Sequence, residues 1–361
     1  MTLTAPCYEC GEKSVVDGLC EQCYNKAHPL LEVRSPLKLI ACKRCDAVKV
    51  PGGWKPIVKH VSDPEELVEH QLDILFQQEV KLNAANVLLE YFEEKRLDRV
   101  RHLILTATGR SHPEIPPHSE DYPMEVRFSF ATCDTCAMMS GGYHEAILQV
   151  RADGREVTEE EIDEIVSLAT DLTVAKYGKD VKAFITEIKR DKYGLDFKIG
   201  SEHLSKRIAD ELESKYLAER KENYRLIGED KGGKKKYRIT ILIRLPQFTL
   251  GDFVRVDKKP CQVLAMGKGG LSCYGLTDGD RFTINPKSAK WRTLEFISPE
   301  SEKRQFMVVS HVYGQPVQVM DSLTFEVHDI EEKDLLFEVS SGQTIFALKL
   351  EEKIHLLPPE N

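Results

Sequence analysis

Four Cys-x-x-Cys pairs constrain the fold of this chain more than any other feature of its sequence. The pairs are Cys7/Cys10, Cys20/Cys23, Cys42/Cys45 and Cys133/Cys136, and the remaining cysteines are Cys261 and Cys273. Each pair sets two thiolates within reach of one metal ion, and eight thiolates complete two tetrahedral four-cysteine sites. The spacing therefore predicts two structural Zn²⁺ ions, with no ligand position left open for catalysis.

The four pairs can combine into two sites in three ways. We favour one site made of the first two pairs, because only nine residues separate them and Gly11 suits the turn after the first pair. The second site then joins the last two pairs across 87 residues and fixes the base of a large insertion. The spacing also leaves a cross-braced combination open.

The composition is that of a multidomain protein from a reducing compartment. With 361 residues, of which 41% are hydrophobic, the chain can form two to four domains with separate cores. Its net charge of -9 argues against indiscriminate nucleic-acid binding but leaves room for a local basic patch. No apolar run is long enough to span a bilayer, and MTLTAPCYEC lacks a signal-peptide core. We expect a cytoplasmic monomer without a membrane partner.

The order of the expected elements divides a multidomain α+β chain into five parts. A treble-clef-like zinc module takes residues 1–56 and 124–145, and residues 57–123 form a helical insertion with a strand. Residues 124–245 form an α+β domain. Short strands joined by Gly and Asp-Gly turns then predict an SH3-like barrel over 246–300 and an OB-like β domain over 301–361.

Hydrophobic spacing predicts the individual elements. A helix starts at Asp63 and Pro64 and continues to about Lys95, with a break near Asn83 left open, and residues 100–108 then form a strand. Residues 125–133 and 143–151 are expected to form a hairpin that carries the last cysteine pair at its turn. Two helices, over 158–178 and 201–217, alternate with strands over 183–190 and 194–200, and the region ends in a hairpin of residues 222–228 and 237–245.

The loop of that last hairpin is strongly basic. Between Arg220 and Arg244, nine Lys or Arg residues stand against three acids, opposite in sign to the whole chain. Lysines at a Gly-flanked tip can approach a phosphate backbone closely, whereas the alternative is a solvated hairpin whose charge protects a strand edge from aggregation. We favour RNA contact, through Lys231, Lys234, Lys235, Lys236 and Arg238.

The sequence contains no local catalytic motif. It lacks a phosphate-binding G-x-x-x-x-G-K-[ST] loop, a nucleophile elbow and an H-E-x-x-H helix, so we do not expect an enzyme. Two alternatives to an RNA- and protein-binding factor are an RNA-modifying enzyme with structural zinc knuckles and a zinc-ribbon adaptor that binds only proteins.

The cysteine pairs, the run CDTCAMMSGGYHEAILQVR and the run IGEDKGGKKKYRITILIRLPQFTLGDFV together resemble the nonsense-mediated-decay protein three family. Its members are assembly factors of the large ribosomal subunit and, in eukaryotes, nuclear-export adaptors. The resemblance implies binding to ribosomal RNA and proteins on the intersubunit face of that subunit, with β-barrels reaching toward the exit tRNA site. Whether an anti-association initiation factor and a GTPase join the complex is left open.

The same resemblance likens the two C-terminal barrels to the hypusine-containing translation factor five A. The GKGG turn at residues 267–270 then takes the place of that factor's modified-lysine loop, which implies that Lys268 contacts ribosomal RNA; the signature for its modification is absent. The chain stops at HLLPPEN, without the shuttling extension of eukaryotic members. We therefore expect an archaeal-type member that acts in subunit maturation or keeps subunits apart.

Overall fold

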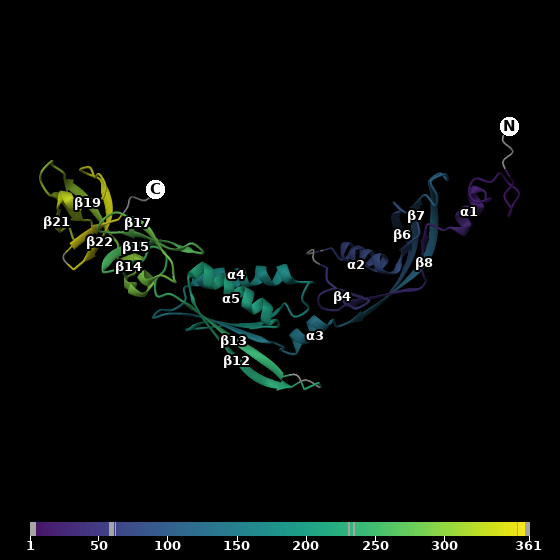
Figure 1. The fold of residues 1–361 in the computed structure, drawn as a ribbon, viewed down its shortest axis with the longest axis horizontal. Helices are drawn as coiled ribbons and strands as arrows, with labels where there is room; N and C mark the ends of the chain where they lie inside the picture. The colour runs from purple at the N-terminus through teal and green to yellow at the C-terminus, as the bar shows by residue number, and fades with distance from the viewer. Residues whose placement is uncertain are drawn as a thin grey trace. The chain divides into compact units, whose positions relative to one another are not determined.

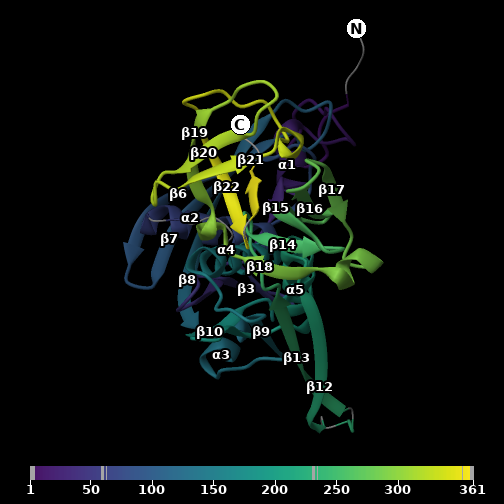
Figure 2. The same cartoon turned by 90° about the vertical axis from the view of Figure 1, so that its left-hand side faces the viewer.

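The chain folds into two compact units that consist mostly of strands (Figures 1 and 2). The computed structural model describes residues 5–57, 61, 63–229, 232–233, 235–351 and 353–357. The first unit is Met1–Gly142 with Tyr177–Lys182, and the second is Tyr143–Lys176 with Ala183–Asn361. Within the described part of the chain, every helix is too short or too polar to cross a lipid bilayer.

The first unit is built on a six-stranded sheet in the order β4-β3-β2-β8-β7-β6. β2 and β8 are parallel, and the other neighbours are antiparallel. Buried leucines from the sheet and from α2 form the core. The strands are β1 (Leu31–Glu32), β2 (Leu37–Cys42), β3 (Val48–Val50), β4 (Gly53–Lys55), β5 (Lys81–Leu82), β6 (Leu88–Leu97), β7 (Val100–Gly109) and β8 (His118–Ala131), and the helices are α1 (Glu21–Ala27), α2 (Pro64–Glu79) and α3 (Asp134–Ser140).

Helix α2 begins as predicted but ends at Glu79, so the helix expected up to Lys95 is wrong. Its start is capped by Asp63, whose Oδ1 accepts a hydrogen bond of 3.1 Å from the backbone N–H of Glu65. The later apolar residues belong to β6, where Leu89 and Tyr91 pack against the core of the unit while their neighbours are more exposed. Leu88, Tyr91 and Phe92 are spaced as on one face of a helix, but in the structure they belong to a strand that pairs with β7.

The hairpin predicted from residues 125–133 and 143–151 does not form. β8 lies between β2 and β7 in the first unit, whereas β9 (Ala146–Ala152) lies between β11 and β13 in the sheet of the second unit. Helix α3 occupies the expected turn. Alternation identifies both strands correctly, but it carries no information about the partner of a strand when that partner is far away in sequence.

An α+β domain opens the second unit, with a sheet in the order β10-β11-β9-β13-β12. Two helices lie side by side on one face of this sheet and bury Ile165, Phe197 and Ile208 beneath them (Figure 1). The predicted helices and strands of this region are confirmed. They are α4 (Glu159–Lys176), β10 (Ile185–Asp191), β11 (Gly194–Ile199), α5 (Glu202–Tyr216), β12 (Glu219–Glu229) and β13 (Lys235–Leu245).

Two five-stranded antiparallel sheets complete the second unit. The first β domain has the order β17-β16-β15-β14-β18, and the second β domain has the order β21-β20-β19-β22-β23. They share an apolar layer that includes Phe253, Tyr274 and Leu348, and His355 Nδ1 lies 3.2 Å from the carbonyl oxygen of Leu276. The strands are β14 (Phe253–Val256), β15 (Lys259–Gly267), β16 (Gly270–Gly275), β17 (Arg281–Ile284), β18 (Glu295–Ser298), β19 (Arg304–Ser310), β20 (Val317–Asp321), β21 (Val327–Ile330), β22 (Thr344–Leu350) and β23 (Lys353–Leu356). Cys261 and Cys273 are buried thiols of the first β domain.

Gly194 provides a test of how tightly β11 packs against the central strand β9. Its φ of +135° favours glycine, and a Cβ there would lie 2.1 Å from the carbonyl oxygen of Val150. We expect Gly194→Ala to lower the free energy of unfolding by about 3 kcal/mol, because strain and a backbone clash add. Urea denaturation of the full chain measures this. Gly267→Ala is the control, since nothing lies within 4 Å of its Cβ position, and equal unfolding midpoints for the two variants would contradict the prediction.

Candidate metal centres and basic arm

The first four-cysteine cluster consists of Cys7, Cys10, Cys20 and Cys23, whose sulfur atoms all lie within 4.8 Å of one another. Gly11 closes the first turn with a φ of +83°, and its N–H donates a hydrogen bond of 2.9 Å to the carbonyl oxygen of Cys7. Cys20 precedes α1, so Cys23 lies in the first turn of that helix. The structure thus brings together the two pairs that the short spacing favoured.

A small apolar core supports this first cluster. Val16, Leu19 and Tyr24 pack around the cysteines together with Ile115, which lies in the connection between β7 and β8. Ser111 in the same connection donates a hydrogen bond of 2.6 Å from its hydroxyl to Asn25. The first cluster is therefore joined to the rest of the unit by the loop that follows β7.

The second cluster consists of Cys42, Cys45, Cys133 and Cys136, again with all sulfur atoms within 4.8 Å of one another. Cys42 ends β2 and Cys133 follows β8, and the parallel register Cys42↔Ala131 sets both at the same edge of the sheet. The N–H of Cys133 donates a hydrogen bond of 3.4 Å to the Cys42 sulfur, and the Cys45 and Cys133 sulfurs lie 3.6 Å apart. Parallel strand pairing thus explains how pairs so distant in sequence meet.

A segment that follows α4 completes the surroundings of the second cluster. Val181 accepts a hydrogen bond of 2.9 Å at its carbonyl oxygen from the hydroxyl of Thr135 on α3. Burial raises the pKa of Tyr177, and the charge and hydrogen bonding of the nearby Cys45 raise it further. Residues Tyr177–Lys182 therefore belong to the first unit, although the helix before them belongs to the second.

Both clusters fit a tetrahedral metal ion. A Zn–S bond of about 2.3 Å implies sulfur separations of about 3.8 Å in a regular tetrahedron. The sulfur separations of 3.4 Å for Cys10/Cys20 and 3.6 Å for Cys45/Cys133 are close to this value. Four soft thiolate donors are typical of a closed site for Zn²⁺, in which the metal holds the chain together and has no open position for a substrate.

Backbone hydrogen bonds stabilise the thiolate form of Cys42 in the second cluster. Burial alone raises the pKa of Cys42, but the N–H groups of Cys133, Arg44 and Cys45 outweigh this effect and lower its pKa to about 6. Burial raises the pKa of Cys133 to about 11 and also raises that of Cys136. Without a metal ion, one thiolate forms readily while other thiols of the cluster keep their protons.

Removing one cysteine should remove one metal ion. We expect purified Cys136→Ser protein to contain one equivalent of zinc in place of two, and its first unit to unfold more easily, because three ligands no longer close the second site. Elemental analysis of metal per chain measures this. Cys273→Ala is the control, because that thiol is buried in the first β domain and belongs to neither cluster. Two equivalents retained by Cys136→Ser would contradict the ligand set.

Zinc affinity should fall as the pH is lowered. Cys133 and Cys136 have raised pKa values, so binding must displace protons from them, and each displaced proton weakens binding roughly tenfold per pH unit below neutrality. Competition with a chromogenic chelator between about pH 8 and about pH 6 measures this. An affinity that does not change with pH would exclude thiolate ligands with raised pKa values.

The basic arm is the hairpin of β12 and β13, which continues past the helices of the α+β domain (Figure 2). Of the predicted RNA-binding residues, Lys231 and Lys234 lie outside the described residues. Lys235 and Lys236 are exposed, and Arg238 is partly buried. Arg238 is opposite Arg225 on the neighbouring strand. The sequence prediction did not include Arg225, although the alternation of side chains along the strand would have revealed it as a further basic residue of the arm.

Lys268 lies apart from the arm, in the turn between β15 and β16 of the first β domain. Its Nζ is 3.4 Å from Oε2 of Glu211 on α5, and its side chain is 75% exposed. At this exposure the ion pair is weak, so the ammonium group can exchange Glu211 for another anion.

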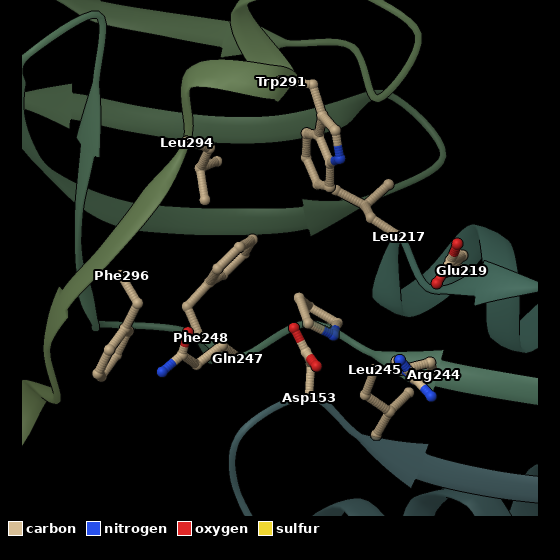
Figure 3. A pocket seen from close by; sticks show the side chains of 11 residues that line it. Asp153, Leu217, Glu219, Arg244, Leu245, Gln247, Phe248, Trp291, Leu294 and Phe296 are labelled. Carbon is tan, nitrogen blue, oxygen red and sulfur yellow. The ribbon is translucent and has the colours of Figure 1, made fainter.

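A cavity of ≈ 370 Å³ lies where the α+β domain meets the first β domain (Figure 3). Phe248 and Trp291 form one side with a ring contact at 6.3 Å between centroids. Asp153, Glu219 and Arg244 bring charge to the opposite margin. The lining contains no histidine, cysteine or serine. Sequence patterns do not reveal this cavity, because its residues come from distant segments.

The two thiol clusters, the α+β domain and the two β domains define a class: a multidomain α+β protein with two candidate zinc centres. Residues 7–141 match the family described as NMD3, N-terminal domain, and residues 143–245 match that described as NMD3, second domain. The chain belongs to the NMD3 family.

Comparison with solved structures gives a similarity to eukaryotic translation initiation factor 5A from Methanococcus jannaschii. It covers 30% of this chain and 88% of that chain, with 19% sequence identity and a TM-score of 0.21. Comparison with curated proteins gives no match.

Proposed function

We propose that this protein is a non-enzymatic factor that binds the large ribosomal subunit during subunit maturation or in keeping subunits apart. The observation that carries the proposal is the match to both NMD3 domains over residues 7–245. It is supported by two four-cysteine clusters of structural type and by a basic arm on an acidic chain. The binding surface is the intersubunit face, toward the exit tRNA site, and the protein acts in the cytoplasm as a monomer.

The two metal ions in this proposal are structural Zn²⁺. The first is bound by the cysteines of residues 7–23 and shapes the N-terminal module. The second joins the end of β2 to the start of α3 and so holds the six-stranded sheet at one edge. Ribosomal RNA and proteins would then contact surfaces whose shape the metal ions maintain.

The arm supplies the phosphate contacts. Nine basic residues between Arg220 and Arg244 give it a positive field in a chain of net charge -9. The predicted contacts are Lys231, Lys234, Lys235, Lys236 and Arg238, and we add Arg225 to the proposal because it is opposite Arg238. Neutralising RNA phosphates releases condensed counterions, so binding through the arm weakens as salt increases.

The proposal includes the domain boundaries. We assign residues 1–56 and 124–145 to the zinc module, 57–123 to an insertion, and 124–245 to the α+β domain. Residues 246–300 are SH3-like and residues 301–361 are OB-like, and Lys268 in the first of these contacts ribosomal RNA. An anti-association initiation factor and a GTPase are the further partners to be tested in the complex.

Co-sedimentation with separated ribosomal subunits tests this function. We expect selective binding to the large subunit, and we expect Lys235→Gln/Lys236→Gln to reduce the slope of log affinity against log salt by about 1 for each phosphate that the variant no longer neutralises. Lys189→Gln/Lys333→Gln removes the same charge from exposed positions outside the arm and should leave the slope unchanged. Equal binding to both subunits, or to neither, would contradict the proposed function.

A further inference from the structure

The arm carries an apolar surface in addition to its charge. Tyr224 and Leu226 on β12 and Tyr237 on β13 are 47%, 49% and 49% exposed, and we call these three residues the aromatic row. Large apolar side chains at neighbouring positions on a protruding hairpin are uncommon on a solvated surface and indicate a binding surface.

Strand register places the aromatic row on one face of the arm. Leu226 is opposite Tyr237, and Tyr224 is opposite Ile239. Residues directly opposite each other in an antiparallel pair share a face, as do residues two apart along a strand. Ile239 is buried in the core of the α+β domain, so the aromatic row continues the face that the helices cover nearer the centre of the sheet.

Helix α5 stops covering this face at Tyr224. Lys206 of α5 is the residue that reaches the ring: its Nζ lies 5.6 Å from the centroid of Tyr224 and 2.8 Å from Glu202. The hydroxyl of Tyr224 donates a hydrogen bond of 3.3 Å to Glu222 at the edge of the ring. Beyond this point the row has solvent on one side, within the part of the chain that the structure describes.

Basic groups outnumber acidic ones around the aromatic row, where Glu222 and Glu229 are the acidic neighbours. Lys235 stands two residues before Tyr237, on the same face of β13, while Arg225 is opposite Arg238 on the other face. Together with Lys206, these groups place cations on both faces of a narrow two-stranded ribbon. Their charge complements a phosphate backbone and opposes the acidic character of the chain as a whole.

We propose that the aromatic row stacks on unpaired bases of RNA while the surrounding cations bind the adjoining phosphates. This rests on the proposed function and specifies its ligand: a single-stranded or looped segment, since the bases of a continuous duplex stack on one another and expose no free face. Stacking on an aromatic ring tolerates any base, because every base has a π-face, and it strengthens binding roughly tenfold per base. Tyr224 and Tyr237 each provide one such ring.

The test compares full-chain protein binding to three RNA probes at one salt concentration: a short oligoadenylate, an abasic strand of the same length, and a duplex of the same length. The abasic strand keeps the phosphates and removes the bases. We expect the wild-type protein to bind oligoadenylate about tenfold or more tightly than either other probe. Equal affinity for oligoadenylate and the abasic strand would overturn the inference, and it would leave the phosphate contacts of the proposed function intact.

Two matched variants test whether the preference for oligoadenylate over the abasic strand comes from the aromatic row. Tyr224→Leu/Tyr237→Leu keeps apolar side chains but removes the rings, and it should bring the affinity ratio between oligoadenylate and the abasic strand close to one without changing the salt dependence. Tyr193→Leu/Tyr313→Leu removes two other tyrosines, 63% and 95% exposed, and should keep the wild-type ratio. A ratio that survives in the first variant would overturn the assignment of stacking to the row. The inference would also be overturned if the wild-type protein showed no preference among the RNA probes while Tyr224→Leu/Tyr237→Leu lost binding to the large subunit. That result would indicate that a protein covers the aromatic row.

Discussion

The first unit depends on the contact between two short turns, one after β2 and one after β8. Closing a loop of 87 residues costs about 4 kcal/mol of chain entropy by the logarithmic scaling of loop closure. Six residue pairs of parallel strand and one buried core favour closure, and a four-thiolate zinc site typically contributes about 10 kcal/mol more. With a metal ion bound, the cysteine cluster would be strong enough to fix the two ends of the segment that contains α2 and the hairpin of β6 and β7.

The second unit shows how an acidic chain can still present a positive surface. Residues 304–357 contain nine acids against four Lys or Arg, whereas the stretch from Arg220 to Arg244 has nine basic residues against three acids. In the proposed function, such segregation would direct a polyanion to the arm and away from the second β domain. Strand β13 of the arm also pairs with β9, so the arm is continuous with a buried strand of the sheet.

Sequence patterns predict the elements of this chain better than they predict which elements are neighbours. Cysteine spacing favours the correct grouping of both clusters, and the cap at Asp63 marks the start of α2. The errors have two causes: a short apolar run can fit both the helix period and the strand period, and a local pattern cannot identify a partner that lies far away in sequence. Leu88, Tyr91 and Phe92 fit a helix although they lie in β6, which pairs with β7. β8 is predicted to pair with the next strand in sequence although β2 is its neighbour. The aromatic row is not apparent from the sequence because register, not spacing, places Tyr224 and Tyr237 together.

The distance between the two halves of the second cluster affects the order in which the chain folds during synthesis. The first cluster has all its cysteines once Cys23 has left the exit tunnel. The second cluster is incomplete from the emergence of Cys42 until the emergence of Cys136. At about 5 to 20 residues per second, that interval is roughly 5 to 20 seconds. Throughout it, β2 has no parallel partner, and Leu37 and Leu39 lack the strand that later buries them. The nascent N-terminal unit is therefore a candidate for chaperone binding, and two of its thiols are open to oxidation, until α3 has been translated.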